Sequence, residues 1–265
     1  MAGDADNHRA LQRDTLHRQV VFGRRQGHKL RPQRQALVRD LLPQIEINLG
    51  SQGRSEGSAT PPEPKPYEAI DPRSLFAKGT KEIWLEIGFG AGEHLAWQAA
   101  RHPDIGFIGC EPFLNGVSAL LDSIARKNLS NVRIFPDDAR LLMARLSSGR
   151  IDRLSVLFPD PWPKSRHQKR RIMSVKNIAS FADIMADGSE FRFASDHAEY
   201  GCWTLLKMLA EPQFRWLAEG PDDWRKRPED WPETRYELKA READRTPLFL
   251  RYERVARSAV RPNYT

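Results

Sequence analysis

Residues 158–164, with the sequence Phe-Pro-Asp-Pro-Trp-Pro-Lys, are the most informative stretch of this chain, and the basic run 165–171 follows them directly. Three prolines in five positions fix φ at about −65° and remove three backbone N–H donors, which excludes both a helix and a paired strand. The segment is therefore a stiff loop that holds one carboxylate, Asp160, and one indole, Trp162, beside a row of cations. We expect a site that handles an anionic polymer, and the plainer alternative is a connector with a solvated charge run.

A second group of residues suited to binding is the glycine-rich stretch 84–94, which ends a strand pattern and opens a helix pattern. Gly88 and Gly90 permit a sharp turn and the close approach of a ligand, and the helix that follows offers free N–H groups. The third glycine comes one residue earlier than in the dinucleotide fingerprint, and Glu86 and Glu93 would repel phosphates. A cationic or zwitterionic ligand suits this loop better, and S-adenosylmethionine, which has no phosphates, is such a ligand.

Further acids follow the next two strand patterns. Glu111 lies 21 residues after Gly90, where an acid accepts hydrogen bonds from both hydroxyls of a ribose; an exposed strand-end acid is the alternative. Asp138 could accept from an adenine amino group, cap a helix, or do both. We expect its neighbour Asp137 to be a solvated turn residue.

These residues need alternating strands and helices to position them. Hydrophobic periodicity predicts strands over residues 81–87, 105–110, 132–135, 151–158 and 190–194, and helices over residues 93–100, 113–127, 138–146, 174–185 and 197–209. Such alternation indicates an α/β fold with a mostly parallel sheet and helices on both faces. A last strand over 248–252 could join the end of the sheet, and residues 34–42 could form a short helix.

Bulk properties limit the choice of protein class. The 265 residues suffice for one large α/β domain with an extension, and a net charge of +7 favours an anionic partner. No apolar run is long enough to span a membrane and no secretory signal is evident, so a reducing cytoplasm is expected. Cys110 and Cys202 have neither metal-ligand nor disulfide spacing; we expect two buried thiols and no metal.

At this point the residues resemble a known family. In this order, the glycine loop from Glu86, Glu111-Pro, Asp138-Ala and the loop 158–167 resemble the bacterial tRNA (guanine-N7)-methyltransferases over about residues 20–255. The loop 158–167 is highly specific, whereas most Rossmann-like methyltransferases share the glycine loop. The resemblance implies a Rossmann-like methyltransferase fold, S-adenosylmethionine as cofactor, and a guanine in the variable loop of tRNA as substrate.

The composition along the chain predicts a domain division. Residues 67–265 would form the methyltransferase domain, and residues 1–66 a basic N-terminal extension with a Gly-, Ser- and Pro-rich linker over 50–66. Residues 24–27, Arg-Arg-Gln-Gly, resemble the basic N-terminal segment of the family. No obligatory protein partner is evident.

Residue roles carried over from the family are as follows. Asp160 would be the catalytic residue, and the cofactor would contact Glu86, Gly88, Gly90, Glu111, Asp138 and Asp160. Contacts with the substrate would come from Lys164, Asp196 and Glu253, and contacts with RNA from Lys164, Ser165, Arg166, His167, Gln168 and Lys169. Asp196 could instead cap the helix that begins at His197.

The family's C-terminal pattern, Thr-x-(Phe/Tyr)-Glu-x-(Arg/Lys), is assigned to residues 250–255. That assignment supplies Glu253, but the threonine position holds Leu250 and the last position holds no base. Thr246, four residues upstream, is the alternative source of the hydroxyl.

The chemistry needs little from a general base. Guanine N7 has a free lone pair, so the enzyme must mainly align N7, methyl carbon and sulfur. We expect Asp160 to accept from the N1–H or amino group of the base and to offset its developing positive charge. Residues 164–171 would hold phosphates, and Trp162 would either stack on a base or pack the loop.

Two other function classes share parts of this pattern. An NAD-dependent oxidoreductase would have the glycine loop and the strand-end acid, but it would have no use for the proline-rich loop beside the cations. A non-catalytic RNA-binding protein would explain the cations but not the acids at the strand ends.

Overall fold

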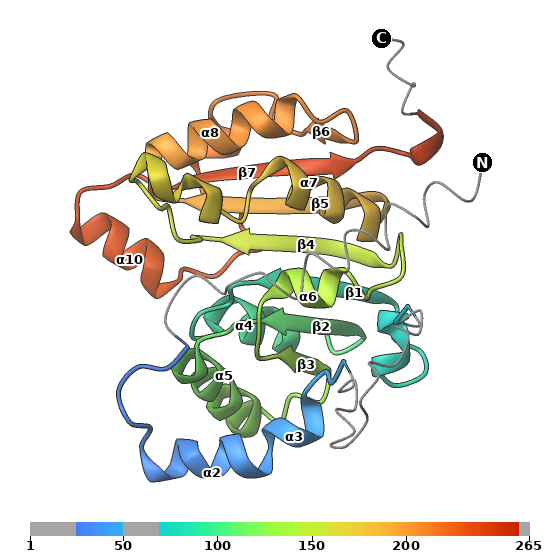
Figure 1. Ribbon diagram of the computed structural model, residues 1–265, viewed down its shortest axis with the longest axis vertical. Helices are drawn as coiled ribbons and strands as arrows, with labels where there is room; N and C mark the ends of the chain where they lie inside the picture. The colour runs from blue at the N-terminus through green and yellow to red at the C-terminus, as the bar shows by residue number, and fades with distance from the viewer. Residues whose placement is uncertain (1–24, 50–68, 260–265) are drawn as a thin grey trace, which may run out of the picture.

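The computed structural model describes residues 25–49 and 69–259. In this part of the chain seven strands form one sheet in the order β3-β2-β1-β4-β5-β7-β6 (Figure 1). The first five strands in that order pair in parallel, and β7 runs antiparallel to both β5 and β6. The strands are β1 Glu82–Ile87, β2 Ile105–Cys110, β3 Val132–Phe135, β4 Ile151–Leu157, β5 Met185–Ser195, β6 Phe214–Trp216 and β7 Leu248–Arg254.

Helices cover both faces of this sheet, with α8 beside β6 and α3 beside β3 (Figure 1). The α-helices are α2 Pro32–Asp40, α3 Leu42–Ile45, α4 Glu93–Arg101, α5 Leu114–Lys127, α6 Ala139–Met143, α7 Val175–Ile184, α8 Ala198–Leu209, α9 Asp222–Arg225 and α10 Arg235–Glu242. Short 3-10 helices are η1 Pro72–Leu75, η2 Ser165–Arg170 and η3 Arg257–Ala259. None of the helices among the described residues is long and apolar enough to cross a membrane.

The alternation of side chains along β1 separates two halves of the core. Trp84 packs with Leu95 and Leu120 under α4 and α5, whereas its neighbour Leu85 belongs to the cluster on the other face that contains Phe181 of α7. Successive strand residues point to opposite faces, so a central strand with apolar residues at nearly every position must be covered twice. The predicted α/β fold, with a mostly parallel sheet and helices on both faces, is confirmed.

Several element bounds differ from the prediction for local reasons. The strand predicted over 151–158 ends at Leu157, because Phe158 adopts a left-handed backbone with φ 51°. β5 begins at Met185, five residues earlier than expected, directly after α7. The elements β6, α9 and α10 were not predicted; β6 and α9 span only three and four residues, and α10 buries only Glu237 and Ala240. Such elements carry almost no hydrophobic periodicity.

Two further expectations concern single residues and the N-terminal extension. Cys110 is buried as expected, but Cys202 is exposed, because it lies on the outward side of α8. In the extension, the described residues 25–49 pack on the domain: Leu42 and Ile47 are buried, and the Ile47 N–H donates to the Ile134 carbonyl oxygen at 2.8 Å. The linker predicted over 50–66 lies outside the described residues, and the division of the chain into 1–66 and 67–265 stays a prediction.

The register of the parallel strands places their carboxyl ends together. Ile87 of β1 is opposite Cys110 of β2 and Val156 of β4. The glycine loop, Glu111 and the proline-rich loop therefore leave the sheet side by side, at the edge where open α/β sheets bind ligands.

Gly116 in α5 allows this helix to lie against the glycine loop, because a Cβ there would be 2.3 Å from the Gly90 carbonyl oxygen. We predict that Gly116→Ala lowers the free energy of unfolding by about 1–3 kcal/mol, as overpacking does elsewhere. Urea unfolding measures this, with Gly220→Ala as the control. Gly220 has open space around it, so that variant should stay within about 0.5 kcal/mol of the wild type. Equal stability of the two variants would contradict this packing.

Candidate active site

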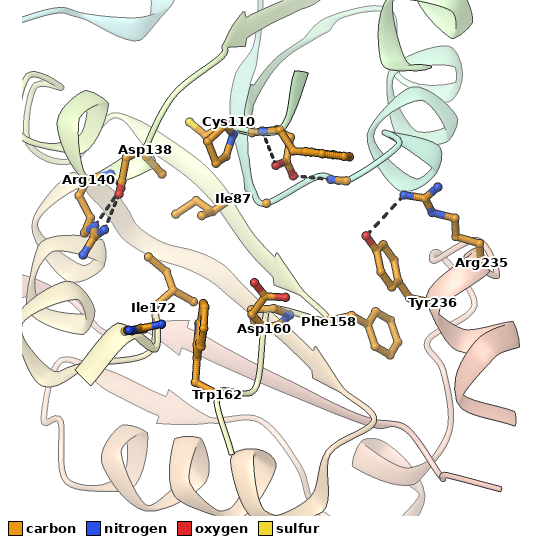
Figure 2. Close-up of a pocket in the computed structure, with 18 residues that line it drawn as sticks. Ile87, Cys110, Asp138, Arg140, Phe158, Asp160, Trp162, Ile172, Arg235 and Tyr236 are labelled. Atoms are coloured by element: carbon orange, nitrogen blue, oxygen red, sulfur yellow. Dashed lines mark hydrogen bonds and ion pairs between the residues drawn. The ribbon is translucent and has the colours of Figure 1, made fainter. Parts of the chain in front are cut away.

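A cavity of about 410 Å³ opens at this edge of the sheet (Figure 2). It is walled by the carboxyl ends of β1, β2 and β4, the start of α6, the end of η2 and the start of α10. Its charged lining residues are the acids Glu111, Asp138 and Asp160 and the arginines Arg140, Arg170 and Arg235. The predicted residues Gly88 and Gly90 also line it. Its size suits a nucleoside-sized ligand.

Glu111 is fixed in this cavity by the backbone of the adjacent loops. Its side chain accepts from the Gly90 N–H at 2.9 Å and from the Phe113 N–H at 3.0 Å. Burial raises the pKa of Glu111, and these two N–H donors partly offset that effect. Because the Gly90 N–H is already used and Glu93 stands in the first turn of α4, the loop does not offer a pyrophosphate its usual cradle. A ligand with a ribose and no phosphate fits these residues.

Asp138 caps α6, as one of the two sequence interpretations proposed. Its Oδ1 accepts from the Arg140 N–H at 3.0 Å and from Arg140 Nε at 2.8 Å, and its Oδ2 contacts Arg140 Nη2 (Figure 2). An adenine amino group would share this carboxylate with Arg140. Asp137 lies in a bend with its side chain 32% exposed, as expected of a turn residue, and its Oδ1 also accepts from Arg25 Nη2 at 2.8 Å, which ties the N-terminal segment to the loop before α6.

The proline-rich loop takes its shape from a buried cation. Arg171 is 1% exposed; its Nε donates to the Pro161 carbonyl oxygen at 2.8 Å, and its guanidinium binds the Glu199 carboxylate at 3.1 and 2.5 Å. The loop also holds Phe158 and Trp162 at positive φ, 51° and 43°, a conformation that costs about 1 kcal/mol or more per residue. The prediction that every cation up to residue 171 holds phosphate is therefore wrong for Arg171, which is enclosed by the loop and α8.

Asp160 stands inside this clamped loop and points into the cavity (Figure 2). The residue as a whole is exposed at the cavity, its carboxylate has no hydrogen-bond partner among the described residues, and partial burial by the surrounding walls raises its pKa. A carboxylate that is held in place without a partner is ready to accept hydrogen bonds from a ligand. Cys110 also lines the cavity, but burial raises the pKa of its thiol so far that it stays protonated.

Aromatic rings form the remaining walls. The Trp162 ring lies edge-on to His167 with centroids 5.9 Å apart, and the Arg170 guanidinium lies 4.8 Å from its centroid. Phe158 stacks on Tyr236 of α10 at 6.3 Å. Tyr236 in turn covers the glycine loop: a Cβ on Gly90 would be 3.0 Å from its ring. Trp162 thus both packs against the loop and lines the cavity.

The cations predicted to contact RNA lie on η2 and beside it. Lys164, Ser165, Arg166 and Lys169 are exposed, and His167 and Gln168 are half-buried. The end of η2 reaches the cavity through Arg170. The structure therefore brings this cationic surface next to Asp160, as the order of residues in the sequence suggested.

The predicted RNA contacts of residues 164–169 lie outside the 410 Å³ cavity, and three other predicted site residues, Glu86, Asp196 and Glu253, do not line it either. Glu86 is buried below the glycine loop and lies 2.7 Å from His94 Nδ1, bordering a small adjoining cavity of about 20 Å³. Asp196 accepts from Arg245 Nε at 2.8 Å; the alternative that Asp196 caps α8 is wrong, because the N-cap of that helix is His197. Glu253 is at the far edge of the sheet, opposite Glu190 in register.

The position of Glu253 corrects the assignment of the C-terminal pattern to residues 250–255. Glu253 pairs with Arg215, away from the cavity, because β7 runs antiparallel and carries its last residues to the other edge. Residues 234–239, Thr-Arg-Tyr-Glu-Leu-Lys, match Thr-x-(Phe/Tyr)-Glu-x-(Arg/Lys) at every position. They begin α10, where Thr234 caps the helix by accepting from the Glu237 N–H. Arg235 and Tyr236 line the cavity, and the Thr-x-x-Glu capping box was the signal that could have found them.

The raised pKa of Asp160 predicts how the free energy of unfolding depends on pH. Its folded-state pKa lies above the unfolded-state pKa, so the folded protein holds this proton more tightly and loses stability as pH rises through that interval. Asp160→Asn, which is neutral throughout, should gain stability relative to the wild type between about pH 4 and pH 7. Urea unfolding across this range measures the gain, with Glu229→Gln at an exposed position as the control. A gain that is the same at both ends of the range would contradict the prediction.

Comparisons with known proteins also indicate a methyltransferase. A family model described as "Putative methyltransferase" matches residues 80–250. The tRNA (guanine-N(7)-)-methyltransferase of Rhodospirillum rubrum is 46% identical to this chain, with 90% of this chain and 89% of that protein covered. Its counterpart in Chelativorans sp. is 45% identical, with 89% and 96% covered.

Solved structures are more distant. An antibiotic-related methyltransferase resembles the chain with a TM-score of 0.47 at 15% identity, over 65% of this chain and 88% of that one, and at this level we draw nothing from the likeness. The two sequence alignments cover nearly the whole of this chain and nearly the whole of each relative. The chain therefore belongs to the tRNA (guanine-N7)-methyltransferase family.

Proposed function

We propose that this protein transfers the methyl group of S-adenosylmethionine to N7 of a guanine in the variable loop of tRNA. The observation that carries this proposal is the position of Asp160. It stands in a clamped loop between a cavity that fits a nucleoside and the exposed cations of η2. The sequence identity of 46% and 45% to two proteins named tRNA (guanine-N(7)-)-methyltransferase, over about nine-tenths of this chain, supports the same reaction.

The cavity residues divide between the two ends of the cofactor. Glu111 would accept from the ribose hydroxyls and Asp138 from the adenine amino group, while Gly88 and Gly90 leave room for the ligand beside the backbone. Glu86, below the loop, would face the cationic amino group at the methionine end. The bound cofactor supplies a methyl group that is activated by its positively charged sulfur.

On the acceptor side, this chain must orient the base. N7 needs no deprotonation, so correct placement supplies most of the rate. Asp160 would accept from the N1–H or amino group of guanine and offset the positive charge that develops on the ring. Its carboxylate is unpaired among the described residues and its loop is fixed by Arg171, so little reorganisation is needed.

The residues that hold the substrate in the C-terminal part are reassigned. We infer that Thr234, Arg235 and Tyr236 at the start of α10 take the role first given to Glu253, because they border the cavities and Glu253 does not. Asp196 would act from outside the cavity, and only after it leaves Arg245.

tRNA would meet cations on two sides of the cavity. Lys164, Arg166 and Lys169 lie exposed at η2. Beyond α5, a groove is lined by the N-terminal residues Lys29, Arg31 and Arg34, together with Leu30, Gln33, Asn115 and Asp122. Phosphate contacts of this kind give affinity that falls with salt. A cytoplasmic location, and action without an obligatory protein partner, remain part of the proposal.

The direct test is to incubate the protein with S-adenosylmethionine and unmodified tRNA and to map guanines that become sensitive to borohydride and aniline. We expect one new cleavage site, in the variable loop, and none with Asp160→Ala at saturating tRNA. Methyl incorporation without cleavage at a new guanine would exclude N7 as the acceptor. Cleavage outside the variable loop would exclude the proposed position in tRNA.

Two arginines of the same basic run should behave differently. Arg171→Met removes the donor to Pro161 and should lower kcat by between about ten- and a hundredfold at saturating tRNA, since Asp160 is misplaced. Arg166→Met removes an exposed cation; it should raise KM for tRNA and reduce the slope of log affinity against log salt by about one. Steady-state kinetics at several salt concentrations separate the two, with circular dichroism to verify folding. An Arg171→Met variant that is altered only in KM would contradict the clamp.

A further inference from the structure

A row of buried, hydrogen-bonded polar side chains lies below the glycine loop. Glu86, His94 and Gln98 are 7%, 7% and 1% exposed. His94 Nδ1 lies 2.7 Å from Glu86 Oε2, and His94 Nε2 lies 3.2 Å from Gln98 Nε2. Buried polar groups cost free energy unless they are paired. These three side chains, from β1 and α4, pair with one another.

The contacts of Gln98 determine where the proton of His94 resides. The amide nitrogen of Gln98 donates to the Asp230 carbonyl oxygen at 2.7 Å, which fixes which end of the amide faces the imidazole. An amide nitrogen only donates, so His94 Nε2 must accept and carries no proton. The proton is then on Nδ1 and is donated to Glu86.

Asp230, the last residue of this hydrogen-bonded row, is itself held by the sheet. Its carboxylate accepts from Arg192 Nη2 on β5 at 2.6 Å, and the same nitrogen donates to Glu190 at 2.8 Å. Trp231 is 4% exposed, and its ring stands edge-on to His94 with centroids 6.0 Å apart. The segment that carries Asp230 and Trp231 leads within a few residues to Thr234, at the start of α10.

Glu86 presents its carboxylate to the cavity of about 20 Å³, which is also bordered by Glu93, Gly88 and Tyr236. That volume holds about one water molecule, and an ammonium group is of similar size. One oxygen of Glu86 is held by His94, and the other has no partner among the described residues. Two carboxylates at a space of this size favour a small cation.

We propose that His94 and Gln98 are positioning residues, which hold the Glu86 carboxylate in the orientation that receives the cationic amino group of the cofactor. The hydrogen-bonded row from Asp230 to Glu86 also joins the segment that bears Thr234 and Tyr236 to the proposed cofactor site. This inference rests on the proposed function for the identity of the cofactor, but it concerns cofactor binding and not the choice of tRNA or of guanine N7.

Two substitutions of His94 separate positioning from simple packing. In His94→Asn the amide nitrogen can take the place of Nδ1 and donate to Glu86, whereas in His94→Gln the amide lies nearer the position of Nε2. We expect the Kd for S-adenosylmethionine, measured by calorimetry, to rise about tenfold in His94→Gln, as the loss of a hydrogen bond to a charged group predicts. In His94→Asn it should rise less than about threefold. KM for tRNA should stay nearly unchanged in both. Equal affinities of the two variants would overturn the proposal.

A second measurement does not depend on activity. Long-range proton–nitrogen NMR spectra of the wild-type protein, with nitrogen-15 in histidine, should show His94 protonated at Nδ1 and not at Nε2. Gln98→Met, which removes the donor, should move part of the proton to Nε2. A proton on Nε2 in the wild type, or an unchanged spectrum in Gln98→Met, would overturn the role of Gln98. A protein that passes these tests but leaves guanine N7 unmethylated would overturn the proposed function alone.

Discussion

Parallel pairing of β1 with β2 on one side and β4 on the other is the constraint on which the site depends. Because parallel strands all end at the same edge, the glycine loop, Glu111 and the proline-rich loop emerge within one cavity although they are far apart in the chain. The neighbouring β3 adds Asp138 at the same edge. The antiparallel β7 cannot contribute in this way from its end, and this is why Glu253 lies at the opposite edge.

The distribution of charge gives the two parts of the site different partners. Glu111, Asp138 and Asp160 line the interior beside three arginines, and burial, with a smaller contribution from the charge of Asp160, raises the pKa of Glu111. Exposed cations lie on η2 beside this cavity, and further cations of the N-terminal segment line a separate groove against α5. The exposed cations would attract a polyanion, while the acids inside would accept hydrogen bonds from a nucleoside. One cation of the run, Arg171, is withdrawn from the surface and holds the loop that carries Asp160.

The segment from Asp230 to Tyr236, at the start of α10, connects features that appear unrelated in the sequence. Asp230 secures Gln98 below the glycine loop, Trp231 packs against His94, and Tyr236 covers Gly90 from the other side. The same short segment therefore borders both the proposed cofactor end and the proposed acceptor end of the site. Its contacts bridge more than a hundred residues of chain, and they fix side chains on α4 that no local pattern singles out.

The sequence alone determined the central strands and helices, since hydrophobic periodicity is a local property, and β2 and β3 have the bounds that it predicted. It also determined that Asp160 lies in a stiff loop, because proline acts on its own backbone. Only the tertiary structure decided that Arg171 is buried, that Cys202 is exposed, and that Glu253 lies away from the cavity. These outcomes depend on which distant elements pack against a residue, and periodicity within a segment contains no information about such contacts.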